Sequence, residues 1–293
     1  MTVTQIADET KWYALARRRR ELDISRAFSF FLQSGIEPIL IKGWAAARYY
    51  PEGQFRNYGD IDLAVSTQDH AEARKLLIDN SDLRLGVDLH REVRHLDTLE
   101  WSRLFQDSKI HQIDGVPIRI ACPEDHLRII STHWLNDGGA PKERLWDIYY
   151  AVENRPVDFD WNRCLNVVSP GRQSWVVASV GLAHKYFGLE IDDLPFAAQA
   201  RDLPGWLTRA VEKEWASGTR LIDLEYCIHD PKLLLSQLRK RIPPNPIQAT
   251  IETEGPIDRS SRIKYQVIDV AKRIPSSIRR VSRELRNRSS RTK

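Results

Sequence analysis

The sequence predicts an α+β protein in which a small mixed sheet with helices is followed by a helical domain. Before residue 123, short apolar or alternating runs stand between Gly, Pro and Asp residues, as expected of strands. After that point, apolar residues recur at helical spacing. The stretch "PPNP" at 243–246 is typical of a stiff linker. We therefore expect three segments: a mixed core at 1–122, a helical domain at 123–242, and a Pro-rich linker with a basic tail at 243–293.

The chain is expected to begin with helix, strand and helix. Apolar residues at approximate helical spacing precede Gly35, which ends the first helix. The short apolar run in "EPILIKG" favours a buried strand that ends at Lys42 and Gly43. The helix-prone "WAAARYY" follows, and Pro51 terminates it. These three elements are expected at residues 11–34, 39–41 and 44–50.

Two aspartates lie in the next strand-like stretch, "RNYGDIDLAV" at 56–65. Side chains alternate along a strand, so Asp60 and Asp62 share one face while the apolar Ile61 and Leu63 share the other. Two neighbouring carboxylates repel each other, and a cation between them relieves that repulsion. The spacing therefore predicts a metal site.

Further strands are expected after a helix at residues 67–79. The stretch "LRLGVDLHREV" alternates so that Asp88 and His90 share a polar face. The stretch "KIHQIDGVPIRIA" predicts a hairpin with Asp114 and Gly115 as its turn. Helices are then expected at 123–135, 142–153, 161–168, 174–188, 203–217 and 219–228, before "PPNP", at 263–273 and after Pro275.

Composition indicates a globular chain with an uneven distribution of charge. A hydrophobic content of 42% argues against disorder. No apolar run is long enough to span a bilayer and no signal-peptide core is visible, so we expect a cytoplasmic location. The three cysteines have no metal-ligand spacing and are expected to be structural thiols. Residues 259–293 hold 12 Lys and Arg against two acidic residues, a net charge of +10 that suggests contact with nucleic acid or an acidic surface.

A set of features typical of phosphoryl transfer comes together in the first segment. Gly43 opens a helix whose N-terminal amide groups suit a phosphate. Asp60 and Asp62 supply oxygen ligands of the kind that Mg²⁺ prefers, and Asp88 lies on the polar face of a later strand. A phosphate site beside three carboxylates indicates a two-metal phosphoryl-transfer centre.

These motifs resemble those of the nucleotidyltransferase superfamily that includes DNA polymerase β. More narrowly, "ILIKGWAAARYYPEGQFRNYGDIDLAV" is similar to a bacterial family of uncharacterised nucleotidyltransferases. The likeness continues into "VDLHREV", "CPEDHLRIISTHW", "LWDIYYAVE" and "FDWNRCL", and covers roughly residues 20–190. The superfamily usually has Gly-Ser or Gly-Gly at the phosphate turn, whereas Trp44 follows Gly43 here.

The resemblance implies a polymerase-β-like nucleotidyltransferase domain followed by a helical domain. It implies transfer of a nucleoside monophosphate from an NTP to an acceptor hydroxyl, with release of pyrophosphate. The acceptor would be a small molecule, a peptide or RNA. The residues it implies are Asp60, Asp62 and Asp88 as catalytic ligands of Mg²⁺, or of Mn²⁺ in its place, and Lys42, Gly43 and Arg56 as ligands of the triphosphate.

Three alternatives remain open from the sequence. His90 shares the polar face of Asp88 and competes with it as the third active-site group, although Mg²⁺ favours the carboxylate. The chain could instead be a non-catalytic binding protein that keeps the nucleotide fold. It could also be a toxin-like enzyme that adds nucleotides to RNA, which the basic tail would suit.

Overall fold

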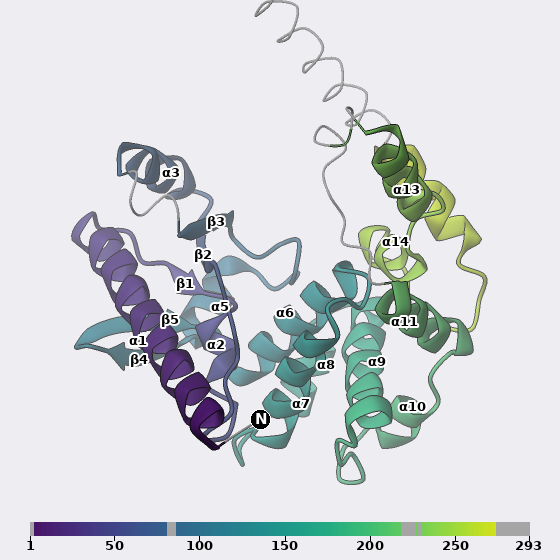
Figure 1. Cartoon of the computed structure of the whole chain (residues 1–293), viewed down its shortest axis with the longest axis horizontal. Coiled ribbons are helices and arrows are strands. Elements are labelled where there is room, and N and C mark those ends of the chain that lie inside the picture. The colour runs from purple at the N-terminus through teal and green to yellow at the C-terminus, as the bar shows by residue number, and fades with distance from the viewer. Residues whose placement is uncertain (1–2, 81–85, 218–226, 228–229, 274–293) are drawn as a thin grey trace, which may run out of the picture. The chain divides into compact units, whose positions relative to one another are not determined.

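A computed structural model describes residues 3–80, 86–217, 227 and 230–273 (Figure 1). The chain folds into two compact units. The first comprises Met1–Ser131 and Trp146–Val168, and the second comprises Thr132–Leu145 and Ser169–Lys293. The first unit therefore extends past the boundary expected after residue 122 and includes the helices at 145–153 and 161–166.

The first unit contains a five-stranded mixed sheet with strand order β3-β2-β1-β5-β4. Strand β1 pairs antiparallel with β2 and parallel with β5, β2 pairs parallel with β3, and β4 pairs antiparallel with β5. The β4–β5 hairpin turns at Asp114 and Gly115, both with positive φ, which confirms the predicted turn. The strands are β1 Ile39–Leu40, β2 Ile61–Val65, β3 Val87–Arg91, β4 Lys109–Ile113 and β5 Val116–Ile120.

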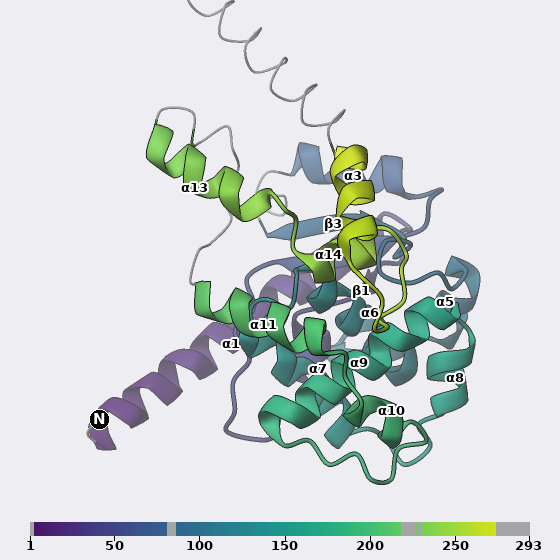
Figure 2. The same cartoon turned by 90° about the vertical axis from the view of Figure 1, so that its right-hand side faces the viewer.

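One face of this sheet is covered by α1 (Val3–Gln33), the one-turn α2 (Trp44–Ala47) and α3 (His70–Asp79), as Figure 1 shows. Phe28 and Phe31 of α1 are buried against Leu63 of β2 in this core. Residues 11–19 of α1 are exposed, and in Figure 2 this end of the helix extends past the strands. The helix thus covers the sheet with its C-terminal half only.

The other face of the sheet carries a second core. Ala64 of β2 lies there with Leu104 of α5 (Trp101–Asp107) and Ile129 of α6 (Pro123–Asn136). Because β2 alternates, Asp62 points to this same face as Ala64. The large apolar residues of β2, Ile61, Leu63 and Val65, therefore lie on the face toward α1, and Asp62 lies on the other face.

Buried charges fix α8 (Trp161–Asn166) within the first unit. Arg128 donates to Asp97 at 2.8 Å and to Asp125 at 2.6 Å, and Arg163 of α8 donates to Asp125 at 2.7 Å. Arg128 also donates to the carbonyl oxygens of Arg163 and Cys164. Since a buried charge is costly without partners, this network sets the position of α8.

The second unit is helical. A Cβ atom at Gly181 of α9 would collide with the carbonyl oxygen of Ala200 in α10, so the close packing of these two helices requires glycine. Its elements are η1 Lys142–Arg144, α9 Pro170–Phe187, α10 Ala197–Arg201, α11 Gly205–Ser217, α13 Pro231–Arg241, α14 Pro246–Glu252 and a helix at residues 263–273. Helix α7 (Leu145–Glu153) belongs to the first unit except for its first residue.

The segment expected as linker and tail is packed within the second unit as far as residue 273. Ile247 of α14 is buried, and Asp269 in the helix at 263–273 is 1% exposed. Lys272 donates to the carbonyl oxygen of Glu252 at 3.1 Å, and Figure 2 shows the yellow helix beside α14. Apolar residues after "PPNP" explain this packing. The rest of the tail, the helix expected after Pro275 and most of the helix expected at 219–228 lie outside the described residues.

The described parts of the chain hold no helix long and apolar enough to cross a membrane. The three cysteines are buried free thiols, as expected of structural cysteines. They are Cys122, Cys164 and Cys227.

Candidate active site

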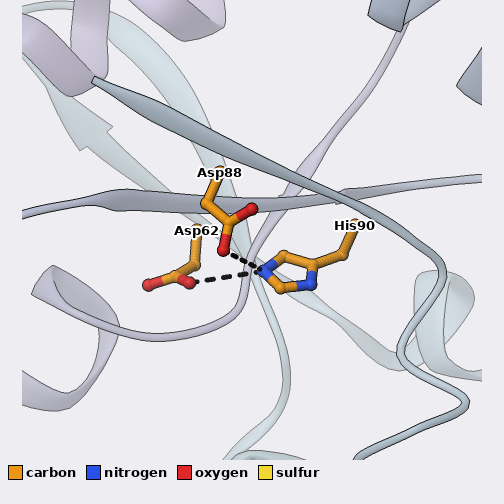
Figure 3. A group of neighbouring side chains, drawn as sticks. All are labelled: Asp62, Asp88 and His90. Atoms are coloured by element: carbon orange, nitrogen blue, oxygen red, sulfur yellow. Dashed lines mark hydrogen bonds and ion pairs between the residues drawn. The ribbon is translucent and has the colours of Figure 1, made fainter. Parts of the chain in front are cut away.

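Three side chains converge on the sheet face opposite α1 (Figure 3). Nε2 of His90 lies 3.3 Å from Oδ1 of Asp62 and 3.3 Å from Oδ2 of Asp88. The ligand-type atoms of all three residues lie within 4.8 Å of one another. We call Asp62, Asp88 and His90 the carboxylate–histidine cluster.

Strand pairing brings the cluster together. In the parallel ladder of β2 and β3, Asp62 lies opposite Asp88 and Ala64 lies opposite His90. The small Ala64 leaves room beside His90, whose ring reaches back between the carboxylates. His95 stacks on His90 with ring centroids 5.2 Å apart, which restricts the orientation of the imidazole.

Lys42 adds a positive charge to the cluster. It follows the β1 region of the sheet, and its Nζ lies 2.7 Å from Oδ1 of Asp62. Burial raises the pKa of the Asp62 carboxyl, but the hydrogen bond from His90 and the charge of Lys42 outweigh burial and hold that pKa below its ordinary value. Asp62 is therefore an anion at neutral pH.

The cluster is open to solvent on one side. The side chain of Asp88 is 59% exposed, whereas those of Asp62 and His90 are 13% and 15% exposed. A ligand can reach the cluster from the side of Asp88 without displacing the core of the sheet.

The donor set fits a divalent cation. Atoms about 2.1 Å from one ion and at right angles to each other lie about 3.0 Å apart, close to the 3.3 Å separations around His90. Two carboxylates with one imidazole suit Mn²⁺, and the oxygen atoms alone suit Mg²⁺. Asp62, Asp88 and His90 together thus fit the divalent metal that the resemblance implies.

Asp60 lies outside the cluster. It is an exposed residue in the bend before β2, which begins only at Ile61. The strand expected at 56–65 is therefore shorter, and the first of the two aspartates sits in the loop that leads into it. The structure brings Asp62 together with Asp88 and His90, and Asp60 is not a member of that group.

Gly43 forms a tight turn between β1 and α2. Its φ of 64° and ψ of −112° lie in a region that residues with a Cβ atom rarely adopt. A Cβ atom here would lie 3.4 Å from the Tyr58 ring and 3.6 Å from the carbonyl oxygen of Asp60. The helix that follows has only four residues, and the N–H groups of Ala45 and Ala46 donate within the turn. The amide site expected for phosphate is consequently small.

Arg56 is paired with a residue far away in the sequence. Its Nε and Nη2 donate to the two oxygens of Asp147 at 2.6 Å and 2.7 Å, and Tyr50 donates to the same carboxylate at 2.8 Å. The Arg56 and Asp147 side chains are 12% and 6% exposed. Burial opposes the charge of Arg56, but Asp147 outweighs it and raises the pKa of the guanidinium. This fork of hydrogen bonds holds the 54–60 loop against α7.

Asp147 and Tyr50 were not expected as site residues. Asp147 and Tyr50 carry the contact that fixes the loop before β2, and His90 joins Asp88 instead of replacing it. From the sequence, Asp147 stands in "LWDIYYAVE", a stretch that the resemblance includes, and a structural hydrogen bond explained it as well as a role in the site did.

Comparison with protein families matches residues 2–188 to a family described as uncharacterised nucleotidyltransferase. The match covers more than half of the chain and includes the whole sheet, the carboxylate–histidine cluster and Lys42. No curated protein matches the chain, and no solved structure does.

Proposed function

The chain belongs to the uncharacterised nucleotidyltransferase family, as its motifs predicted, and from this premise we propose a metal-dependent transfer of a nucleoside monophosphate to an acceptor hydroxyl. Family membership identifies a nucleotidyltransferase that uses an NTP, with the nucleotidyltransferase domain at the N-terminus and a helical remainder. The metal, the catalytic residues and the acceptor are the proposed part.

The carboxylate–histidine cluster would hold a divalent cation, Mg²⁺ or Mn²⁺. Such an ion, when bound, lowers the pKa of a coordinated hydroxyl and neutralises charge on phosphate oxygens. Asp62 contributes a carboxylate that is ionised and held in place by β2. His90 would supply Nε2 as a further ligand, because this atom lies 3.3 Å from an oxygen of each carboxylate. We assign Asp60, in the adjoining loop, to a second cation of a two-metal site.

Lys42 and Gly43 would receive the phosphates. The Lys42 ammonium lies 2.7 Å from Asp62, so a phosphate drawn to it also lies beside the cluster. Gly43 provides the positive φ of the turn between β1 and α2, which a residue with a Cβ atom would adopt only with strain. Arg56 is better assigned to positioning, because Asp147 binds two of its nitrogens and thereby orders the loop before Asp60.

The exposed carboxylate of Asp88 would face the acceptor. It is the one member of the cluster that is more than half exposed, at 59%. An acceptor hydroxyl near this oxygen can pass it a proton, while the attack breaks the bond between the α-phosphorus and the pyrophosphate leaving group.

The observation that supports this proposal most strongly is the meeting of Asp62, Asp88 and His90 on one sheet face. To test it, the purified protein is incubated with each NTP, Mg²⁺ or Mn²⁺, and candidate small-molecule, peptide and RNA acceptors. Intact mass then reveals a nucleoside monophosphate added to an acceptor, with pyrophosphate released. Asp62→Asn should abolish the product, whereas Asp79→Asn, which makes the same change on the exposed end of α3, should not.

A second candidate function is nucleotide binding without turnover. The ion pair between Lys42 and Asp62 favours it, because an ammonium already neutralises the carboxylate that a metal would need. In that case calorimetry would detect NTP binding that is indifferent to Mg²⁺ and Mn²⁺, and no acceptor would gain mass. Metal-dependent NTP binding together with a labelled acceptor would exclude this candidate.

A further inference from the structure

A pocket of about 480 Å³ lies between α1 and the 54–59 loop, apart from the carboxylate–histidine cluster. Arg17, Arg19 and Arg20 line it from the exposed half of α1, and Phe55 and Tyr58 line it from the loop. None of Asp62, Asp88 and His90 is among its lining residues. Its volume is in the range of small-molecule sites.

The guanidinium groups of this pocket are only partly neutralised. Arg17 donates to Glu21 through Nε, and Arg20 lies 3.7 Å from Asp23, a loose ion pair. Arg19 has no acidic partner among the residues that the structure describes. Three cations on one side of a pocket favour an anion, and guanidinium matches the geometry of phosphate oxygens.

Aromatic rings form another part of the pocket wall. The Tyr13 and Phe55 rings stack with centroids 5.5 Å apart and planes 11° apart, and Tyr13 is 47% exposed. A stacked pair of this kind offers a flat surface to a further planar ring, and base–aromatic stacking beside basic residues is how proteins hold single nucleotides of a strand.

One polar atom in the wall lacks a partner. The hydroxyl of Tyr58 is buried and makes no hydrogen bond within the described residues. Burial and the nearby carboxylate of Glu21 raise the pKa of this hydroxyl to about 12, so it stays protonated and keeps a proton to donate. A buried hydroxyl without a partner costs stability, and Tyr58 lines the pocket, so a ligand oxygen that reaches this hydroxyl would remove that cost.

Amide side chains favour a nucleobase over a plain phenyl ring. Gln54 and Asn57 line the same pocket, and amides present both a donor and an acceptor to a base edge. Tyr150 donates to Oε1 of Gln54, which fixes the amide and leaves its NH₂ group outside that bond.

We propose that this α1–loop pocket is a second ligand site, which binds a nucleoside phosphate. The phosphate pairs with the arginines of α1, the base stacks on Tyr13, and the Tyr58 hydroxyl donates to the ligand. A free nucleotide and a single nucleotide within an RNA strand both present this phosphate and this base. Because Gly59, directly before Asp60, lines the pocket, an occupied pocket also braces the loop that leads into β2.

The test measures binding and requires no transfer activity. Titration calorimetry on the full chain, in EDTA and about 0.15 M salt, uses the four nucleoside 5′-monophosphates and RNA hexamers as probes. Arg19→Gln should raise Kd at least about tenfold. Tyr58→Phe should raise it about fivefold, without lowering the melting temperature, because it removes an unsatisfied hydroxyl.

Arg18→Gln is the matched control, since Arg18 belongs to the same arginine run but pairs with Asp114 and does not line the pocket. It should change Kd less than about twofold. Equal weakening by Arg18→Gln and Arg19→Gln would show diffuse attraction to a basic helix and overturn the proposal.

Two further outcomes separate this site from the proposed active site. If Asp62→Asn removes nucleotide binding and Arg19→Gln leaves it intact, the nucleotide binds at the carboxylate–histidine cluster and the second site is refuted. Binding that survives Asp62→Asn supports the second site even when no transfer is found. Hexamers that bind at least about tenfold tighter than monophosphates identify an RNA strand as the ligand of the pocket when Arg19→Gln removes that advantage, and equal affinities identify a free nucleotide.

Discussion

The ion pair between Arg56 and Asp147 allows a test of whether Arg56 has a structural role or binds phosphate. Arg56→Met and Asp147→Asn each leave one charge buried, because the two side chains are 12% and 6% exposed. Stranding a buried charge typically costs about 3–5 kcal/mol of stability. Tyr50→Phe, which removes one hydrogen bond to the same carboxylate and strands no charge, should cost only about 1–2 kcal/mol.

The double variant Arg56→Met with Asp147→Asn completes the cycle. With both charges gone, its loss of stability should be smaller than the sum of the two single losses by about 2 kcal/mol or more. Urea unfolding measures the free energies. Hydrogen exchange of the peptides covering residues 50–60 and 145–153 shows whether the loop opens away from α7 in the single variants.

A different result would restore the role expected from the sequence. If Arg56→Met unfolds within about 0.5 kcal/mol of the unaltered chain, exchanges normally at 50–60 and yet loses NTP affinity at least about tenfold, the guanidinium contacts phosphate. The positioning role of Asp147 would then be refuted.

Three other predictions follow from the site and its surroundings. Asp88→Asn should lower kcat about 10²-fold with little change in NTP affinity. In a metal titration, His90→Gln should weaken the binding of Mn²⁺ more than that of Mg²⁺, since imidazole suits Mn²⁺ better. Equal weakening for the two metals would remove His90 from the ligand set. Burial, with the charges of Arg48 and Arg56, lowers the pKa of His126 to about 3. Between about pH 6.5 and 3 only the unfolded chain therefore binds this proton, and the contribution of His126 to the free energy of unfolding falls by about 1.4 kcal/mol per pH unit as pH drops. His126→Phe should flatten that slope, and an unchanged slope would contradict the burial argument. Removing residues 274–293 should weaken RNA binding and reduce its salt dependence. Cutting before residue 259 should in addition destabilise the second unit, where Asp269 is buried. Equal stability of the two truncations would contradict the packing of 259–273.

Local patterns in the sequence predicted the sheet well. Alternation located β2 and β3, and the Asp114-Gly115 pair located the hairpin, because these signals depend only on neighbouring residues. The one-turn α2 was predicted longer, and α5 was not predicted, since a seven-residue helix offers too few apolar positions for a period to be read.

The site was predicted in part for the same reason. The shared face of Asp88 and His90 follows from period two, so both could be named as candidates. Their meeting with Asp62 depends on the parallel register of β2 and β3, which no local pattern encodes. Likewise, Arg56 finds its partner 91 residues later in the chain. Long-range pairing of this kind requires the folded structure.

The alternation of β2 has a consequence for how this chain can change over evolutionary time. Leu63 is fully buried under α1 while Asp62 faces the other way, so one inserted or deleted residue in β2 would turn the carboxylate into the apolar core under α1 and remove it from the cluster. Loss of the fold and loss of the chemistry would then come from one event. Insertions and deletions that preserve both must therefore fall outside β2, so length changes among descendants should spare residues 61–65.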